Sequence, residues 1–374
     1  MNKIETYSDY IDRLVRLQVP FAFFRRSGEE IGLVVQTEGD VCSIDDICRL
    51  DGMSGYVMAP FQVRKECPVV VIRPDCTDVC ALERFLNRQE ADGSTRSSEM
   101  QPADRNEADC CESEEEYAWR IRPFVEALQD GEFDKLVFSR KRQVDCRGAV
   151  SVGEAFKEAC SSYPQSYVYV CYTPQTGLWM GSTPEIILAG EDEQWHTVAL
   201  AGTQSMQGDE LPSQWSPKNR REQAYVTEYI RSILQNQAQE VCENGPFTVQ
   251  AGALAHLKTE FLFRLAPTCT PAQLLEQLHP TPAVCGLPKA ESFGYIVRRE
   301  GYDRSYYSGF TGCWNYHGRT DLYVNLRCMR REGDRAVLYA GGGILKSSDV
   351  HEEWLETEKK MQTMCRLISE RCLR

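Results

Sequence analysis

The chain has 374 residues, of which 42% are hydrophobic and 26% charged, and this balance excludes a fibrous or disordered protein. Its formal net charge of −13 and its lack of Lys/Arg-rich blocks argue against binding to nucleic acid. Without a signal-like apolar segment or a stretch of roughly 18 apolar residues, we expect a cytoplasmic protein of one large domain or two closely packed ones.

Residues 1–90 begin with a helical pattern and continue with three short β-like runs, at 30–37, 55–63 and 68–74. We expect these elements to belong to the same fold as the rest of the chain. Residues 91–116 are polar, acidic and almost free of large aliphatic side chains. Such a composition cannot support a packed core, so it predicts a solvated, flexible excursion.

Residues 117–374 hold most of the regular patterns. Helical periodicity occurs at 117–131, 152–163 and 216–234 and again near the C-terminal end, and strand-like runs lie between these segments. The strands come in hairpin-like clusters, and the helices are inserted irregularly. This order favours an α+β protein with large antiparallel sheets over a doubly wound parallel sheet.

The seventeen cysteines are scattered along the chain. They show neither C-x-x-C spacing nor a paired Cys/His pattern, so they do not match a zinc framework. We expect reduced thiols that are mostly buried as small hydrophobic side chains.

Two of the predicted helices direct carboxylates toward their apolar faces. Near the C-terminal end, Glu353, Glu356 and Lys360 fall within about 60° of one another on a stripe that continues with apolar residues. In the helix that Ser216 is expected to cap, Glu222 also shares an apolar stripe. A solvated ladder of salt bridges is one explanation. Two inward glutamate sites also suit a hard cation such as Mg²⁺.

Other polar residues could complete a site for an anionic substrate. Arg327 is expected to leave a strand on the face opposite to its apolar residues, where a guanidinium could clamp a carboxylate. Glycines 341–343 follow a predicted strand and would let backbone N–H groups approach an anion, although a bulge or turn is the commoner reason for them. Lys135 and Glu185, at strand ends, are acid–base candidates, although such residues are usually solvated.

Taken in chain order, the motifs resemble those of the chorismate-utilising enzymes, which include isochorismate synthase, salicylate synthase and the large subunits of anthranilate and aminodeoxychorismate synthase. The resemblance covers roughly residues 118–370 and rests on FDKLVFSR, GSTPEIIL, LAGT, KNRREQ, HLKT, LHPTPAVCGLP, REGYDRSYYSGFTG, NLRC and AGGGILKSSDVHEEWLETEKK. It implies an α+β fold, an α/β sandwich of the anthranilate synthase component I type, with large antiparallel sheets around a central cleft. Residues 117–374 would form the chorismate-binding catalytic region.

The resemblance also implies roles for individual residues. Lys135 matches the general base and Glu185 the general acid. Glu222 and Glu356 match ligands of Mg²⁺, with Glu353 acting through water. The residues that match the lining of the substrate pocket are Gly202, Thr203, His256 and Lys360 on the ring side, Ala283 in LHPTPAVCGLP, and Arg327, Tyr307 and Gly342 around the enolpyruvyl carboxylate.

The reaction implied by the resemblance converts chorismate into isochorismate. Lys135 would take a proton from water that attacks C2 of the ring, and Glu185 would protonate the C4 hydroxyl as it leaves. Mg²⁺ on the ring carboxylate would neutralise charge and orient the substrate. For Glu185 to hold its proton, its pKa must be raised, as burial in a closed cleft would do.

Within the family, position 283 favours isochorismate synthase, because Ala stands there in that group and Thr or Ser in salicylate and anthranilate synthases. Val284 leans toward the menaquinone type, and a siderophore pathway is the alternative. Salicylate synthesis, an aminating activity with a separate glutaminase, and a catalytically silent binding module stay open. Asn219 stands where some relatives carry an acid, so the surroundings of the metal are open too. We expect a monomer without an obligatory protein partner.

Overall fold

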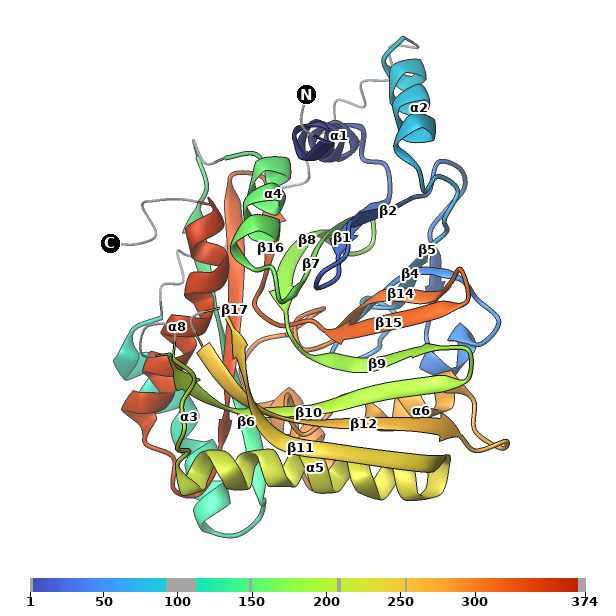
Figure 1. Cartoon of the computed structure of the whole chain (residues 1–374). Coiled ribbons are helices and arrows are strands. Elements are labelled where there is room, and N and C mark those ends of the chain that lie inside the picture. Colours follow the sequence, from blue (N-terminus) through green and yellow to red (C-terminus); the bar gives the residue numbers. More distant parts are fainter. Residues whose placement is uncertain (1–2, 92–111, 148–149, 207–209, 253, 369–374) are drawn as a thin grey trace.

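The computed structural model describes residues 3–91, 112–147, 150–206, 210–252 and 254–368. In this part of the chain two large antiparallel sheets face each other, and helices lie on their outer faces (Figure 1). The predicted α+β class with large antiparallel sheets is therefore confirmed. None of the described helices combines the length and the apolarity that a membrane crossing requires.

The first sheet has eight strands, and helices cover its outer face. In spatial order the strands are β13 (Gly286–Leu287), β6 (Lys135–Asp145), β17 (Arg335–Ile344), β16 (Cys328–Glu332), β8 (Gly177–Thr183), β7 (Tyr167–Thr173), β1 (Phe21–Arg25) and β2 (Ile31–Val35). The helices on this face are α1 (Lys3–Leu17), α2 (Val79–Ala91), α4 (Val152–Ser162) and α8 (Val350–Ile368).

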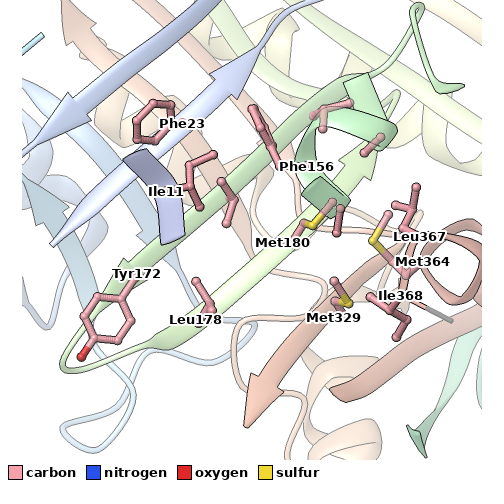
Figure 2. Close-up of a cluster of buried hydrophobic side chains, with 14 of the residues drawn as sticks. Ile11, Phe23, Phe156, Tyr172, Leu178, Met180, Met329, Met364, Leu367 and Ile368 are labelled. Atoms are coloured by element: carbon pink, nitrogen blue, oxygen red, sulfur yellow. The ribbon is translucent and has the colours of Figure 1, made fainter. Parts of the chain in front are cut away.

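Side chains from these helices and from the first sheet form one apolar core. Figure 2 shows part of it, with Ile11 of α1, Phe156 of α4 and Met364 of α8 directed toward the strands. Because successive residues of a strand point to opposite faces, Phe23 joins this core whereas Phe24 faces the second sheet. Both faces of β1 are thus buried, which explains the run of four apolar residues, 21–24, that precedes Arg25.

The second sheet has nine strands. In spatial order they are β11 (Ala238–Ala251), β12 (Leu254–Leu265), β10 (Gln194–Ser205), β9 (Ile186–Glu191), β15 (Arg319–Val324), β14 (Phe310–Tyr316), β4 (Gly55–Ala59), β5 (Val69–Ile72) and β3 (Cys42–Ile44). Its outer face packs against α5 (Pro217–Gln237), α6 (Pro271–Leu278) and the 3₁₀ helix η1 (Ile47–Leu50). Two further helices, α3 (Glu114–Gln129) and α7 (Lys289–Arg299), contact β6.

A layer rich in tyrosine fills the space between the sheets. Tyr167 of the first sheet stacks on Tyr323 of the second, with ring centroids 4.0 Å apart. The Tyr167 hydroxyl donates to the hydroxyl of Tyr56 at 3.1 Å, so it is not buried without a partner. Tyr307 and Tyr339 belong to the same layer and also line the cavity described below.

The first ninety residues contribute strands to both sheets. β1 pairs with β7 in the first sheet, and β4 pairs with β14 in the second. Of the excursion predicted at 91–116, residues 92–111 lie outside the described part of the chain. The predicted end of this segment is wrong, because α3 begins at Glu114, where Ser113 and Glu116 form a capping box.

Candidate active site

The chain passes directly from one sheet to the other at two neighbouring places. β8 of the first sheet continues into β9 of the second, and β15 of the second continues into β16 of the first. The amide of Val324 donates to the carbonyl of Glu185 at 2.9 Å, and the amide of Ser182 donates to the carbonyl of Arg327 at 3.1 Å. These bonds hold Glu185 and Arg327, one in each connection, next to each other between the sheets.

Arg327 does not lie on a strand, and the prediction that it projects from a strand face is wrong. The expected strand ends at Val324, and Arg327 has a φ of 44°, in the left-handed region that few residues other than glycine adopt. Its guanidinium donates to the carbonyl of Ala251 at 3.0 Å and to Nε2 of His256. Arg327 is therefore fixed by the end of β11 and by β12.

His256 holds Arg327 as a neutral imidazole. Burial, together with the nearby Arg327 and Lys360, holds the pKa of His256 well below its ordinary value. Nδ1 lies 3.1 Å from the carbonyl of Gly202, so Nδ1 carries the proton and Nε2 accepts from the guanidinium. Burial lowers the pKa of Arg327 to about 10, which leaves it charged at neutral pH.

A cavity lies at these connections, and its empty space, including the part open to solvent, is about 640 Å³. The predicted site residues that line it are Glu185, Gly202, Thr203, Glu222, His256, Ala283, Tyr307, Arg327 and Lys360. The structure thus brings together residues from both sheets, from α5, from α8 and from the loop before α7. Of the other predicted residues, Lys135 and Glu356 are each ion-paired with a residue of the lining.

Glu185 is a buried carboxyl group that keeps its proton at neutral pH. It is 3% exposed, and burial raises its pKa to about 8, although Lys135, Lys360 and Arg327 act in the opposite direction. A carboxyl group with such a pKa can donate a proton near pH 7. This matches the state that the general-acid role requires.

Lys135 is the first residue of β6 and is fully buried. Its Nζ lies 3.1 Å from Oε1 of Glu222 and forms no hydrogen bond of acceptable geometry with the described residues. A buried amine with one ionic partner is free to form hydrogen bonds with a substrate or a water molecule.

Each of the three carboxylates predicted as metal ligands is paired with a lysine. The pairs are Glu222 with Lys135, Glu356 with Lys360 at 2.7 Å, and Glu353 with Lys218. Against the effect of burial, Lys360 and Lys218 hold the pKa of Glu356 below its ordinary value. Burial raises the pKa of Glu353 to about 7, with Lys218 opposing and Glu356 adding to the rise.

Glycines 341–343 lie within β17 and do not follow a strand, contrary to the prediction. A Cβ on Gly343 would lie 1.9 Å from Oε1 of Glu222, and one on Gly342 would lie 3.0 Å from Oε2 of Glu353. The absence of side chains therefore lets the carboxylates of α5 and α8 approach the strand. Gly342 was expected in the substrate pocket, but the structure places it against Glu353, while Gly341 and Gly343 line the cavity.

The three glutamates suit a hard cation by their chemistry. They offer the oxygen ligands that Mg²⁺ prefers, and the buried Oε2 of Glu353 has no hydrogen-bond partner among the described residues. The ligand atoms of the three glutamates do not all lie within 4.8 Å of one another. Among the described residues, a group of Asp46, Cys48 and Glu276 near the surface does have its ligand atoms within that distance. The glutamates thus stand at lysine-paired positions around the glycines of β17.

Ala283 lines the cavity from a loop that backbone hydrogen bonds hold in shape. The amides of Val284 and Cys285 both donate to the carbonyl of Thr281 at 3.0 Å. Lys289, the first residue after the loop, donates to the carbonyl of His279, the first residue of the loop, at 2.8 Å. The loop, residues 279–288, therefore presents a wall of fixed shape, with the uncharged Ala283 and Val284 facing the cavity.

Sequence reasoning missed Lys218, whose ammonium pairs with Glu353. Lys218 precedes Glu222 by four residues, so the helical period that placed Glu222 inward would have placed Lys218 on the same side. Asn219, where an acid was considered, donates to the carbonyl of Thr203 at 3.2 Å. It therefore ties α5 to the LAGT motif of β10.

The comparisons with known proteins agree with this geometry. A family model described as "Chorismate binding enzyme" matches residues 61–369. Isochorismate synthase EntC of Escherichia coli (strain K12) is 28% identical over 239 residues, which cover 62% of this chain and 61% of EntC. Isochorismate synthase MenF of the same strain is 31% identical over 245 residues, which cover 63% of this chain and 56% of MenF. The match thus spans about three fifths of the length of these relatives.

The fold is shared with a solved structure over almost the whole chain. The structure of MenF, the menaquinone-specific isochorismate synthase from Escherichia coli, superposes with a TM-score of 0.77. The superposition covers 99% of this chain and 92% of that chain at 19% sequence identity. The predicted chorismate-binding fold, with antiparallel sheets around a central cleft, is confirmed.

Proposed function

Since this chain belongs to the chorismate-binding enzyme family, we propose that it is an isochorismate synthase that uses Mg²⁺ to convert chorismate into isochorismate. One observation carries the proposal. Glu185, a buried acid with a pKa of about 8, lines the cavity within electrostatic range of the buried amine of Lys135, which is ion-paired with Glu222 of the same lining. A proton donor and a proton acceptor are what an exchange of ring hydroxyls requires.

Lys135 and Glu185 divide the proton transfers between them. Once its ion pair with Glu222 is broken and the amine is neutral, Lys135 takes a proton from the water that attacks C2 of the ring. Glu185 donates its proton to the C4 hydroxyl as that group leaves, and the ring double bonds shift. Because Glu185 is protonated at neutral pH, it starts the reaction in the state that this step consumes.

Cationic groups around the cavity suit a substrate with two carboxylates. Arg327 remains charged when buried and is held by His256, so it is oriented before the substrate arrives. Tyr307 lines the same cavity, and we assign the enolpyruvyl carboxylate to these two residues. Lys360, whose Nζ donates to the carbonyl of Gly341 at 2.8 Å, belongs to the ring side.

Glu222 and Glu356 would hold Mg²⁺, with Glu353 acting through water. Bound there, the ion would neutralise the ring carboxylate and orient the substrate. Support comes from the unpartnered oxygen of Glu353 and from the glycines of β17 that give the carboxylates room. Three lysines balance these charges in the structure, so removal of the metal should leave the fold intact.

Ala283 supports the choice of isochorismate as the final product. It lines the cavity without a hydroxyl that could bind another nucleophile or assist the loss of pyruvate. For the pathway we propose menaquinone synthesis, on the basis of Val284, which lines the cavity next to Ala283.

The test is to incubate the purified protein with chorismate and Mg²⁺, with and without ammonium, and to separate the products. We expect isochorismate under both conditions and no turnover after treatment with EDTA. Salicylate with pyruvate, or an aminated product, would replace the proposal by another activity of the family. Binding of chorismate without any product would identify a silent binding module.

The metal ligands are tested by Glu222→Gln, which keeps the shape of the side chain but removes its charge. We expect the Mg²⁺ concentration for half-maximal activity to rise about tenfold or more, since ligand charge governs affinity for hard cations. An unchanged response to Mg²⁺ and EDTA would count against this metal site. The expectations of a monomer and of a cytoplasmic location stay predictions, which light scattering and cell fractionation would test.

A further inference from the structure

The edge of β6 that carries Lys135 is bound by the loop that carries Ala283. β13, at the end of this loop, pairs with the start of β6, and the amide of Val137 donates to the carbonyl of Cys285 at 2.7 Å. Before Cys285 the loop turns away, and its main-chain bonds to β6 end there. The carbonyl of Val137 and the amide of Ser139, next along this edge, need other partners.

Arg304 supplies the donor for the carbonyl. Its guanidinium donates to the carbonyl of Val137 at 3.1 Å and to the carbonyl of Val284 at 2.7 Å. Both valines line the cavity. One planar group thus takes the place of the missing main-chain bond and sets the distance between the strand and the loop.

Glu300 supplies the acceptor for the amide and neutralises the arginine. Its Oε1 accepts from the amide of Ser139 at 2.7 Å and from the hydroxyl of Ser139 at 2.8 Å. Each carboxylate oxygen also accepts from Arg304 at 2.6 Å. The pair therefore joins three parts of the chain: strand β6, the loop, and the segment between α7 and β14.

Stability alone is a weak reason for this pair. Both side chains are only 1% exposed, and the guanidinium lies 4.4 Å from the ring centroid of Phe61. Taking two charges out of water costs several kcal/mol, and apolar side chains of similar volume are often at least as stabilising. Apolar side chains could not bind two carbonyls and an amide at set distances. What the ion pair adds is a fixed distance between the strand and the loop.

We propose that the Glu300–Arg304 pair positions the loop with Ala283 against the strand with Lys135, and so sets the width of the cavity on the ring side. Neither residue lines the cavity, so both act through Val137 and Val284. The effect on turnover rests on the proposed function. The effect on the loop does not, and it can be measured without substrate.

The test is Arg304→Lys, which keeps the charge but replaces the planar fork by a single ammonium that cannot reproduce the same set of bonds. We expect the amides of 281–287 to exchange with deuterium about tenfold faster, because the loop opens locally. In the enzyme assay we expect kcat to fall about tenfold and KM for chorismate to change less than about threefold, since Arg327 and Tyr307 are untouched.

Arg26→Lys is the matched control. Arg26 also forms an ion pair with a buried acid, Asp321, at 2.9 Å, but neither residue lines the cavity. We expect this control to lower stability without changing loop exchange or the ratio of kcat to KM. If Arg304→Lys does not fold, Ser139→Ala replaces it, since it removes one of the bonds to Glu300 and should shift the same readouts in the same direction by about twofold.

The outcomes separate the two proposals. If the Arg304 and Ser139 variants only lose thermal stability, with loop exchange and kcat within twofold of the wild type, the pair is structural and the positioning role is wrong. If the wild type makes no isochorismate, the proposed function fails, while hydrogen exchange still decides whether the pair holds the loop.

Discussion

Two walls of the cavity are built on opposite principles. The carboxylate wall combines Glu222, Gly341 and Gly343 of the lining with Glu353 and Glu356, which lie next to Gly342 outside the lining. A lysine is paired with each of the three acids. The loop wall, residues 279–288, faces the cavity with Ala283 and Val284 and is held from behind by backbone hydrogen bonds and buried side chains. Its role is therefore to give shape.

The difference implies a division of labour. Each glutamate can exchange its lysine for a metal ion, and each lysine can exchange its glutamate for an anion. The carboxylate wall should therefore control rate and affinity. A wall without charge controls which molecules fit beside the ring and which product leaves. Substitutions on the two walls should therefore differ in kind as well as in size.

The largest effect should come from Lys135→Ala. The change removes the proposed base and leaves Glu222 without its partner, so we expect kcat to fall by about 10³-fold while the circular dichroism spectrum is retained. Lys359→Ala is the control, because Lys359 lies on the surface of α8 and donates to Ser205. Turnover at the wild-type rate by Lys135→Ala would remove Lys135 from its role.

Glu185→Gln should lower kcat by about 10²-fold or more, because an amide cannot donate the proton. The wild type itself should lose activity as the pH rises through about 8, where Glu185 loses its proton. A flat profile of kcat between pH 6 and 9 would exclude Glu185 as the acid.

Glu185→Gln should lower activity, but at high pH it should raise stability. The pKa of Glu185 is raised in the folded state, so the folded state holds more protons than the unfolded state, and stability falls as the pH rises from about 4.5 through about 8. Glu185→Gln should therefore raise the free energy of unfolding by a few kcal/mol at pH 9 and by little near pH 4. Urea denaturation at both pH values would measure it.

Gly343→Ala and Gly342→Ala form a matched pair within the carboxylate wall. The new methyl group at 343 would meet Glu222 at 1.9 Å and Lys135 at 3.0 Å, so Glu222 must move. We expect about tenfold weaker binding of Mg²⁺, measured by calorimetry. At 342 the nearest contact is 3.0 Å from the end of Glu353, and we expect less than a twofold change. Equal effects would refute the role of Gly343.

The smallest effect on rate should come from the loop wall, with Ala283→Thr. The added hydroxyl faces the cavity, so we expect kcat within about threefold of the wild type but a new fraction of pyruvate-releasing or altered product, seen by chromatography. Pure isochorismate at an unchanged rate would show that position 283 does not select the product. A loss of kcat as large as that of Lys135→Ala would show that the two walls do not differ in their effect on rate.

Much of the fold followed from local patterns. The N-cap at Ser216 followed from its residue type and the inward direction of Glu222 from the helical period, and the structure has both. Burial of Glu353 on α8 followed in the same way. Helical spacing fixes which side chains share a face, so the carboxylates could be assigned to one side before any contact was known.

Other features could not be predicted from local patterns. The alternation of Leu322, Val324, Leu326 and Cys328 continues across the connection between the sheets, so nothing in it indicates that the strand ends before Arg327. The glycines of β17 were expected after a strand. They are needed because Glu222 and Glu353 approach the strand, and these glutamates belong to other elements, which the local pattern does not reveal. The role of Arg304 and Glu300 could not be predicted, because their hydrogen-bond partners are a carbonyl and an amide far away in the chain.

The sequence by itself determined the elements, the inward carboxylates and the motifs that place the chain in its family, because these depend on residue spacing along one segment. The tertiary structure decided which segments meet. It placed Glu185 and Arg327 in adjacent connections between the sheets and paired Glu222, Glu353 and Glu356 each with a lysine. It also bound the loop of Ala283 to the strand of Lys135 through Arg304. Burial of charge and satisfaction of backbone groups depend on three-dimensional neighbours, which residue spacing alone does not specify.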